Sequence, residues 1–230
     1  PFSFRHPAHT ARMASAVDDL SGGRLTLGLG AGWQEREHVL FGFDLLDVKS
    51  RLDRFEEGME VVTRLLKSDE PVTFDGRYYQ IRGGTLLPRP QKKGGPRILV
   101  GGGGEKRTLP LVVKYADEWN CVMLTSDTFI NKNALLNELL TAAGRKPESV
   151  RRSMMTGCLF GTNEAALNGK VAATGASLEE LQAHGFVAGN ADAVNDQLGR
   201  LEEAGLQRIM LQWLDLDDMD GLEALAKAVL

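Results

Sequence analysis

Short apolar runs alternate with longer helix-like segments along most of this chain, and this alternation constrains the fold more than any other feature. Strands are predicted at residues 24–30, 97–100, 119–123, 153–160 and 208–213, and helices at 8–20, 51–67, 105–116, 128–143, within 162–184, at 191–204 and from 219 to the end. A helix on each crossover makes the sheet parallel and covers it, so we predict the α/β class. The strand–helix units are compatible with an open doubly wound sheet or with a closed eight-unit barrel.

A different pattern interrupts the alternation near residues 71–82. Two β-prone stretches flank Asp75-Gly76, a dipeptide typical of tight hairpin turns, so we predict an inserted β-hairpin. The order of motifs is otherwise continuous over the 230 residues, and we predict a single domain covering residues 1–230.

Charge and composition argue against several classes of protein. The chain has 27 Lys and Arg against 31 Asp and Glu, a net charge of −4, which argues against nucleic acid as the main partner. No apolar run approaches the ~20 residues of a membrane helix, and the first residues lack a secretion pattern, so we expect a cytoplasmic protein without membrane contact. Cys121 and Cys158 are expected to be buried free thiols, and no metal site is expected from the spacing of the histidines.

The best-placed motif is a run of glycines between the strand predicted at 97–100 and the helix after it. The run consists of Gly101, Gly102, Gly103 and Gly104. Glycines let the backbone approach an anion closely, and a helix N-terminus favours a phosphate. Lys106 and Arg107 lie in the predicted first helical turn, where cations oppose the helix dipole, which suggests that they hold phosphate. The alternative is a turn whose glycines only let the helix pack on the strand; the spacing fits neither the Walker A nor the Rossmann fingerprint.

A second candidate site follows the strand predicted at 24–30. It consists of Gly30, Ala31, Gly32 and Trp33, with Glu37 and His38 a few positions further on. Parallel α/β folds build their sites at the carboxyl ends of strands. Trp33 could stack on a planar ring or pack in the core, and Glu37 or His38 could orient or protonate a substrate.

Motifs spread from residue 5 to beyond residue 205 point to one family. They are Arg5-His6-Pro7, residues 19–33, Glu37-His38, Phe41-Gly42, Arg51 with Glu56-Glu57, residues 74–79, 88–91 and 98–104, Ala116-Asp117, Trp119-Asn120 and Ala204-Gly205. Together they resemble the luciferase-like monooxygenase superfamily, in particular its coenzyme F420-dependent oxidoreductases. The resemblance covers nearly the whole chain and implies a (β/α)8 TIM barrel of the bacterial-luciferase type.

The resemblance also implies a chemistry. Hydride would pass between the deazaflavin F420 and a small organic substrate, with residues 101–104 on the cofactor phosphate and residues 30–37 beside the ring. A monooxygenase that uses FMN and oxygen is the alternative, and the basic residues Lys92, Lys93, Lys106 and Arg107 favour the anionic tail of F420. Some sugar-phosphate dehydrogenases of the family have an acid where this chain has Trp33, so that activity is not implied. The habit of the family implies a homodimer.

Three strands of the family's barrel have no counterpart at the start of this sequence, and we expect those segments to be missing from it. Two further interpretations stay open. One is a non-catalytic flavin-binding relative that has lost part of the barrel. The other is a structural αβ domain that binds no cofactor.

Overall fold

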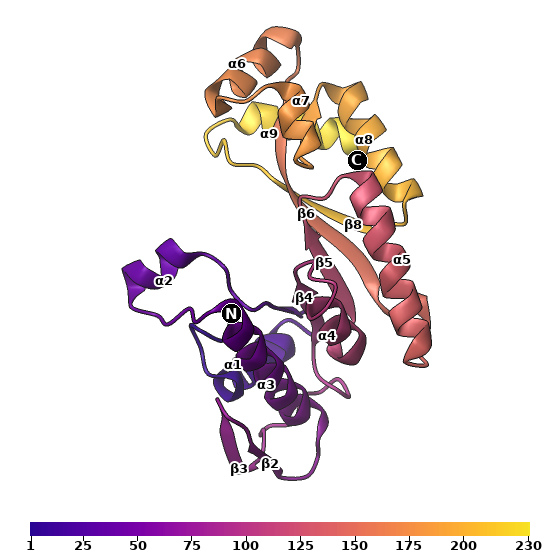
Figure 1. The fold of residues 1–230 in the computed structure, drawn as a ribbon. Coiled ribbons are helices and arrows are strands. Elements are labelled where there is room, and N and C mark those ends of the chain that lie inside the picture. Colours follow the sequence, from indigo (N-terminus) through magenta and orange to yellow (C-terminus); the bar gives the residue numbers. More distant parts are fainter. The chain divides into compact units, whose positions relative to one another are not determined.

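Parallel strand pairing dominates the computed structural model, which describes residues 1–230 (Figure 1). The chain forms two compact units, Pro1–Glu118 and Trp119–Leu230, and the predicted single barrel domain stays a prediction. No helix is both long enough and apolar enough to cross a membrane.

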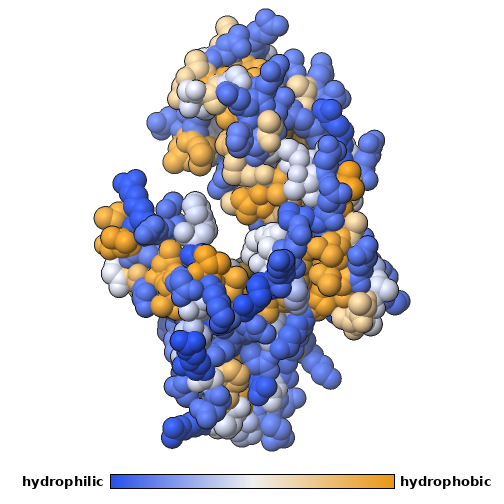
Figure 2. All heavy atoms as spheres, in the orientation of Figure 1, coloured by the Kyte–Doolittle hydropathy of each residue, from blue (hydrophilic) through white to orange (hydrophobic).

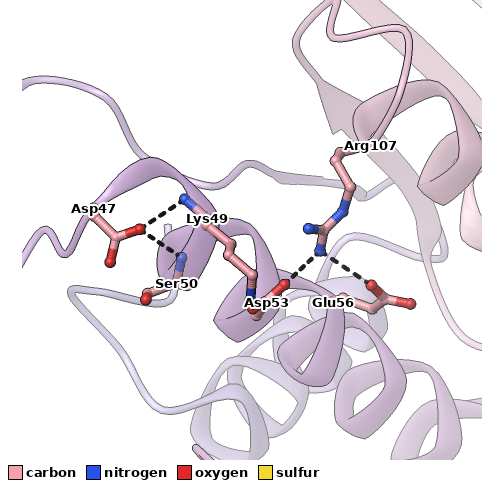
Figure 3. Close-up of polar contacts among 6 residues, drawn as sticks. All are labelled: Asp47, Lys49, Ser50, Asp53, Glu56 and Arg107. Atoms are coloured by element: carbon pink, nitrogen blue, oxygen red, sulfur yellow. Dashed lines mark hydrogen bonds and ion pairs between the residues drawn. The ribbon is translucent and has the colours of Figure 1, made fainter.

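The first unit contains one parallel strand pair covered by helices. Its elements are α1 (Pro7–Leu20), β1 (Thr26–Leu29), α2 (Glu35–Phe41), α3 (Val48–Lys67), β2 (Val72–Asp75), β3 (Gln80–Gly84), β4 (Arg97–Gly101) and α4 (Thr108–Tyr115). Strands β1 and β4 pair in register from Thr26 opposite Arg97 to Leu29 opposite Val100. Helix α3 buries Phe55 and Met59 and begins where the Asp47 carboxylate accepts the N–H groups of Lys49 and Ser50 (Figure 3).

The predicted hairpin is confirmed, and its turn extends beyond the Asp75-Gly76 dipeptide. Strands β2 and β3 are antiparallel, and the last pair before the turn is Asp75 opposite Gln80. Residues 76–79 therefore form the turn. The Glu57 carboxylate on α3 accepts the N–H groups of residues 77, 78 and 79 at 2.9, 2.8 and 3.3 Å, so a distant side chain stabilises the longer turn.

Helix α4 is shorter than the sequence predicts, beginning at Thr108 rather than at residue 105. Pro110 accounts for the difference, because proline lacks an N–H and fits only the first turn of a helix. A helix beginning at 105 would place Pro110 beyond that turn. Residues 105–107 form a turn instead, and the Gly104 carbonyl accepts the N–H groups of Thr108 and Leu109.

The second unit is arranged around the long strand β6. Its elements are β5 (Glu118–Val122), α5 (Ser126–Ala142), the 3-10 turn Pro147–Ser149, β6 (Arg151–Phe160), α6 (Glu164–Thr174), α7 (Leu178–Ala183), β7 (Val187–Gly189), α8 (Ala191–Glu203), β8 (Arg208–Gln212) and α9 (Met219–Val229). Strands β7 and β8 both pair with β6 in parallel, β8 along its first part and β7 along its last residues.

Other predictions for the second unit are also confirmed. Asn190 caps α8 by accepting the N–H of Ala193 at 3.0 Å. Cys121 and Cys158 are buried free thiols. Burial raises the pKa of the two thiols, to about 12 for Cys121 and about 11 for Cys158, so both are neutral at ordinary pH.

The sequence patterns missed α2 and β7. Helix α2 exposes Val39, Leu40 and Phe41 in succession, so its apolar residues lack the helical period that predicts an amphipathic helix. Strand β7 is only three residues long, too short for a periodic signal. The strand predicted at 24–30 is also less buried than expected, since Leu29 is buried but Gly28 is exposed.

Candidate functional site

Two glycine-rich segments lie side by side in the first unit because they follow neighbouring parallel strands. Leu29, at the end of β1, is opposite Val100 on β4, so Gly30 and Gly101 continue from adjacent positions. A Cβ on Gly101 would lie 3.9 Å from the carbonyl oxygen of Leu29. The structure thus brings together the predicted residues 30–33 and 101–104 at one edge of the sheet, where parallel α/β folds bind their ligands.

The loop after β4 consists of glycines, so it presents backbone atoms and no side chains to a ligand. Gly102 has φ of +116°, a conformation that only glycine adopts without strain. A Cβ on Gly104 would lie 3.0 Å from the Thr108 hydroxyl, so the loop closes tightly over the start of α4. The first turn of α4 has fewer free N–H groups for a ligand than a helix N-terminus usually has. The N–H groups of Thr108 and Leu109 already donate to the Gly104 carbonyl, and Pro110 has no N–H. A phosphate here would meet the glycine loop itself.

The four basic residues that favour an anionic cofactor differ in their surroundings. The Arg107 guanidinium is 2.8 Å from Asp53 and 3.4 Å from Glu56, both on α3, so it joins α4 to α3 (Figure 3). Lys92 and Lys93 precede the amino end of β4, whereas the glycine loop follows its carboxyl end, and a strand of this length rises about 16 Å. Lys106 alone is exposed beside the loop. Arg107 is thus paired with carboxylates, and the part of the three lysines in binding an anionic cofactor tail stays a prediction.

Trp33 lies on the surface, not in the core. Its exposed fraction is 78%, which leaves the indole face available to a planar ligand. Apolar side chains continue over α2, where Val39, Leu40 and Phe41 are 66–72% exposed (Figure 2). Glu37, on the same helix, is exposed and directed to solvent.

His38 is only 2% exposed and is held on both sides of its ring. Its Nδ1 is 2.7 Å from the Gln34 carbonyl and its Nε2 is 2.7 Å from the Ser3 hydroxyl. A carbonyl can only accept, so Nδ1 carries a proton and donates it to Gln34, while Nε2 shares a hydrogen bond with the Ser3 hydroxyl. Phe4 packs on the imidazole at 4.6 Å between ring centroids. These contacts fix the start of α2, and the catalytic role of Glu37 and His38 stays a prediction.

Ser3 and Phe4 carried no signal in the sequence. They are 35 and 34 positions from His38, and no motif connects them with it. Thr108, which the glycine loop covers, was likewise missed. Such partners become visible only when the elements have come together.

The fold defines a class of protein, an α/β barrel-type chain with glycine-rich segments after two neighbouring parallel strands. A family model described as "Luciferase-like monooxygenase" matches residues 1–226, and the chain belongs to this family. The resemblance inferred from the motifs is thereby confirmed.

Curated relatives include monooxygenases and F420-dependent dehydrogenases. The chain is 36% identical over 97 residues to a 4-hydroxyprotoasukamycin monooxygenase from Streptomyces nodosus subsp. asukaensis, a match that covers 42% of this chain and 25% of the relative. It is 30% identical over 158 residues to an F420-dependent glucose-6-phosphate dehydrogenase from Kineococcus radiotolerans, covering 65% of this chain and 43% of the relative. The matched segments thus span less than half of these relatives.

Solved structures confirm the fold. An F420-dependent secondary alcohol dehydrogenase in complex with an F420-acetone adduct superposes with a TM-score of 0.80 at 20% identity, covering 97% of this chain and 75% of that chain. The F420-dependent tetrahydromethanopterin reductase from Methanopyrus kandleri superposes with a TM-score of 0.76 at 18% identity, covering 98% and 79%. The predicted luciferase-type α/β barrel fold is confirmed, and the chain corresponds to about three quarters of such a chain.

Proposed function

We propose that this protein is an oxidoreductase that binds coenzyme F420 and exchanges a hydride between it and a small organic substrate. The observation that carries the proposal is the parallel register of β1 and β4, which places two glycine-rich strand ends side by side. Dehydrogenases named as F420-dependent among the relatives support the choice of cofactor.

The residues at this edge fit such a cofactor. A side chain at Gly102 would be strained, and a Cβ at Gly104 would meet Thr108, so both positions leave the backbone uncovered. A phosphate bound by backbone N–H groups needs such an uncovered backbone. Trp33 presents an exposed aromatic face to a planar ring. F420, when bound, supplies the hydride chemistry. The residues of the chain hold the phosphate at the loop, orient the ring at residues 30–33 and keep one face of it from water.

Titration with F420 and FMN in separate experiments, followed by the fluorescence of each ring, tests the proposal. We expect F420 to bind, and Gly103→Asp to weaken its binding at least tenfold, because a carboxylate in the loop repels the phosphate. Gly199→Asp is the matched control, since Gly199 lies on α8 in the other unit, with nothing within 4 Å of an added Cβ and no left-handed backbone. Unchanged F420 affinity in Gly103→Asp would show that the loop does not hold the phosphate.

An FMN-dependent monooxygenase is the second candidate. The monooxygenases among the relatives favour it, and the ion pairs of Arg107 with α3 weaken one reason to prefer F420. Tight FMN binding with oxygen consumption, and no F420 binding, would select this function. Cofactor binding without turnover would indicate a non-catalytic relative.

We also propose that the protein is a cytoplasmic homodimer. Sedimentation velocity would test its oligomeric state.

A further inference from the structure

The second unit contains a cavity that no sequence motif pointed to. It has a volume of about 690 Å³ and lies where β6 and β8 reach their carboxyl ends, beneath α6 and α7. Pockets that bind small organic molecules commonly measure roughly 300–1,000 Å³. The cavity is therefore large enough to enclose a ligand of that kind.

The walls of the cavity are mainly apolar and rest on a packed core. Phe160 and Cys158 on β6 are buried in the core cluster of this unit, against which Trp213 packs. The Phe186 ring occupies the space that a side chain at position 157 would need, since a Cβ on Gly157 would lie 2.1 Å from it. Glycine at this position thus lets an aromatic ring form part of the wall. A wall supported in this way keeps its shape when empty.

The charged groups at the cavity leave no unpaired positive charge. Lys170 and Asp215 are its charged lining residues. The Lys170 ammonium is 2.5 Å from Asp218 and 3.8 Å from Asp215, and it lies 4.4 Å from the centre of the Trp213 ring. The hydrogen bond from Lys170 lowers the pKa of Asp218, so this carboxylate is ionised at neutral pH. Asp215 and Asp218 carry two negative charges against the one positive charge of Lys170. The side of the cavity near Lys170 is therefore net negative and repels anions.

We propose that this cavity binds a neutral, mainly apolar organic molecule and disfavours anionic ones. It lies at the carboxyl ends of β6 and β8, where parallel α/β folds bind ligands. The ligand class is thus an uncharged molecule with a large apolar body, rather than a phosphorylated sugar.

Two fluorescent probes with the same aromatic body test the proposal. N-phenyl-1-naphthylamine is neutral, whereas 8-anilinonaphthalene-1-sulfonate carries one negative charge. We expect the neutral probe to bind once per chain, and the sulfonate to bind at least tenfold more weakly. Asp215→Asn should reduce this difference at least threefold. Equal affinity for the two probes would overturn the proposal.

Variants that fill the cavity test whether the neutral probe binds there. Ala173 lines it, whereas its neighbour Ala172 on α6 does not, and both are exposed. Ala173→Trp should weaken binding of the neutral probe at least tenfold, whereas Ala172→Trp should stay within twofold. Thr174→Trp repeats the test at another lining position if thermal melting shows that Ala173→Trp is poorly folded. Unchanged probe binding in a folded filling variant would show that the probe binds elsewhere. The titrations contain no F420, so their result is independent of the cofactor proposal.

Discussion

His38 illustrates how the surroundings of a single residue limit what it can do. Both ring nitrogens are engaged, one with the Gln34 carbonyl and one with the Ser3 hydroxyl, and Phe4 covers the ring. A general acid or base needs a nitrogen directed at the substrate. In this arrangement the imidazole connects the first residues of the chain to α2, and its catalytic role stays a prediction.

A substitution pair on α2 separates stabilisation from catalysis. His38→Ala should lower the free energy of unfolding by about 2–4 kcal/mol, because it removes a buried ring and two hydrogen bonds. Glu37→Ala, at the exposed neighbouring position, should change it by less than about 0.5 kcal/mol. Urea unfolding followed by circular dichroism measures both. A fully stable His38→Ala variant that had lost turnover would favour the catalytic role instead.

At the scale of elements, α3 connects the first unit through its carboxylates. Glu57 holds the hairpin turn, Glu60 accepts a hydrogen bond from Tyr115 on α4, and Asp53 pairs with Arg107. Each contact joins segments at least 20 positions apart in the sequence, since Glu57 and Tyr78 are separated by 21 positions and Glu60 and Tyr115 by 55. One helix thus sets the positions of the hairpin and of the segment that follows the glycine loop.

The link between Tyr115 and Glu60 predicts a loss of stability at high pH. Burial raises the pKa of Tyr115 to about 12, and the hydrogen bond to Glu60 adds to the shift. An unfolded tyrosine ionises near pH ~10. The stabilisation from the protonated side chain is therefore complete below that pH and is lost as the pH rises to about 12.

Tyr115→Phe tests this linkage. At neutral pH the variant should be less stable by about 1–2 kcal/mol, because the Glu60 carboxylate loses a donor. Its stability should then decline less than that of the wild type between pH ~10 and 12. Cys121 and Cys158 ionise at a similar pH in the wild type and in the variant, so their contribution is the same in both. The difference in urea-unfolding free energy between the two proteins at each pH therefore reports on Tyr115. Parallel pH profiles would contradict the assignment.

The hairpin turn also depends on one carboxylate of α3, that of Glu57. Glu57→Ala removes the acceptor of the N–H groups of residues 77–79 and should destabilise the chain by about 1–3 kcal/mol. Glu70→Ala, at an exposed loop position, is the control and should have little effect. Amide hydrogen exchange should accelerate at residues 77–79 in Glu57→Ala alone; protection unchanged from wild type would refute this role of Glu57.

For the whole molecule, the local charge of the cavity says more about ligands than the net charge does. The chain has a net charge of −4, yet the cofactor proposed for it is itself anionic, so the net charge excludes no anion. The cavity of the second unit carries its own negative balance, since Asp215 and Asp218 lie beside the one ammonium of Lys170. Electrostatic repulsion of this kind weakens the binding of anions. We therefore expect a substrate bound in this cavity to be uncharged, unlike the glucose 6-phosphate in the names of some relatives.

A comparison of two substrates with F420 tests that expectation. A neutral secondary alcohol with a long apolar chain should be oxidised with reduction of F420, and glucose 6-phosphate should react at least 100-fold more slowly at equal concentration. The loss of F420 absorbance measures both rates, and an F420-dependent glucose-6-phosphate dehydrogenase assayed alongside shows that the sugar phosphate is competent. Faster reaction of glucose 6-phosphate would contradict the expected substrate class.

Local patterns in the sequence determined the class of the fold and the location of one candidate site. The order of strands and helices, the hairpin insertion and the glycines after β1 and β4 follow from short-range periodicity and from the backbone freedom of glycine, which neighbouring residues reveal. The parallel pairing of β1 and β4 then places the two glycine segments at the same edge of the sheet.

Only the tertiary structure decided the partners of individual side chains and the presence of the cavity. Arg107 was read as a phosphate ligand from its neighbours, yet its partner Asp53 is 54 positions away. Glu57 and His38 depend on equally remote groups, and the cavity is lined from two strands and two helices. Contacts of this range depend on which elements pack together, and that information is absent from any short stretch of sequence.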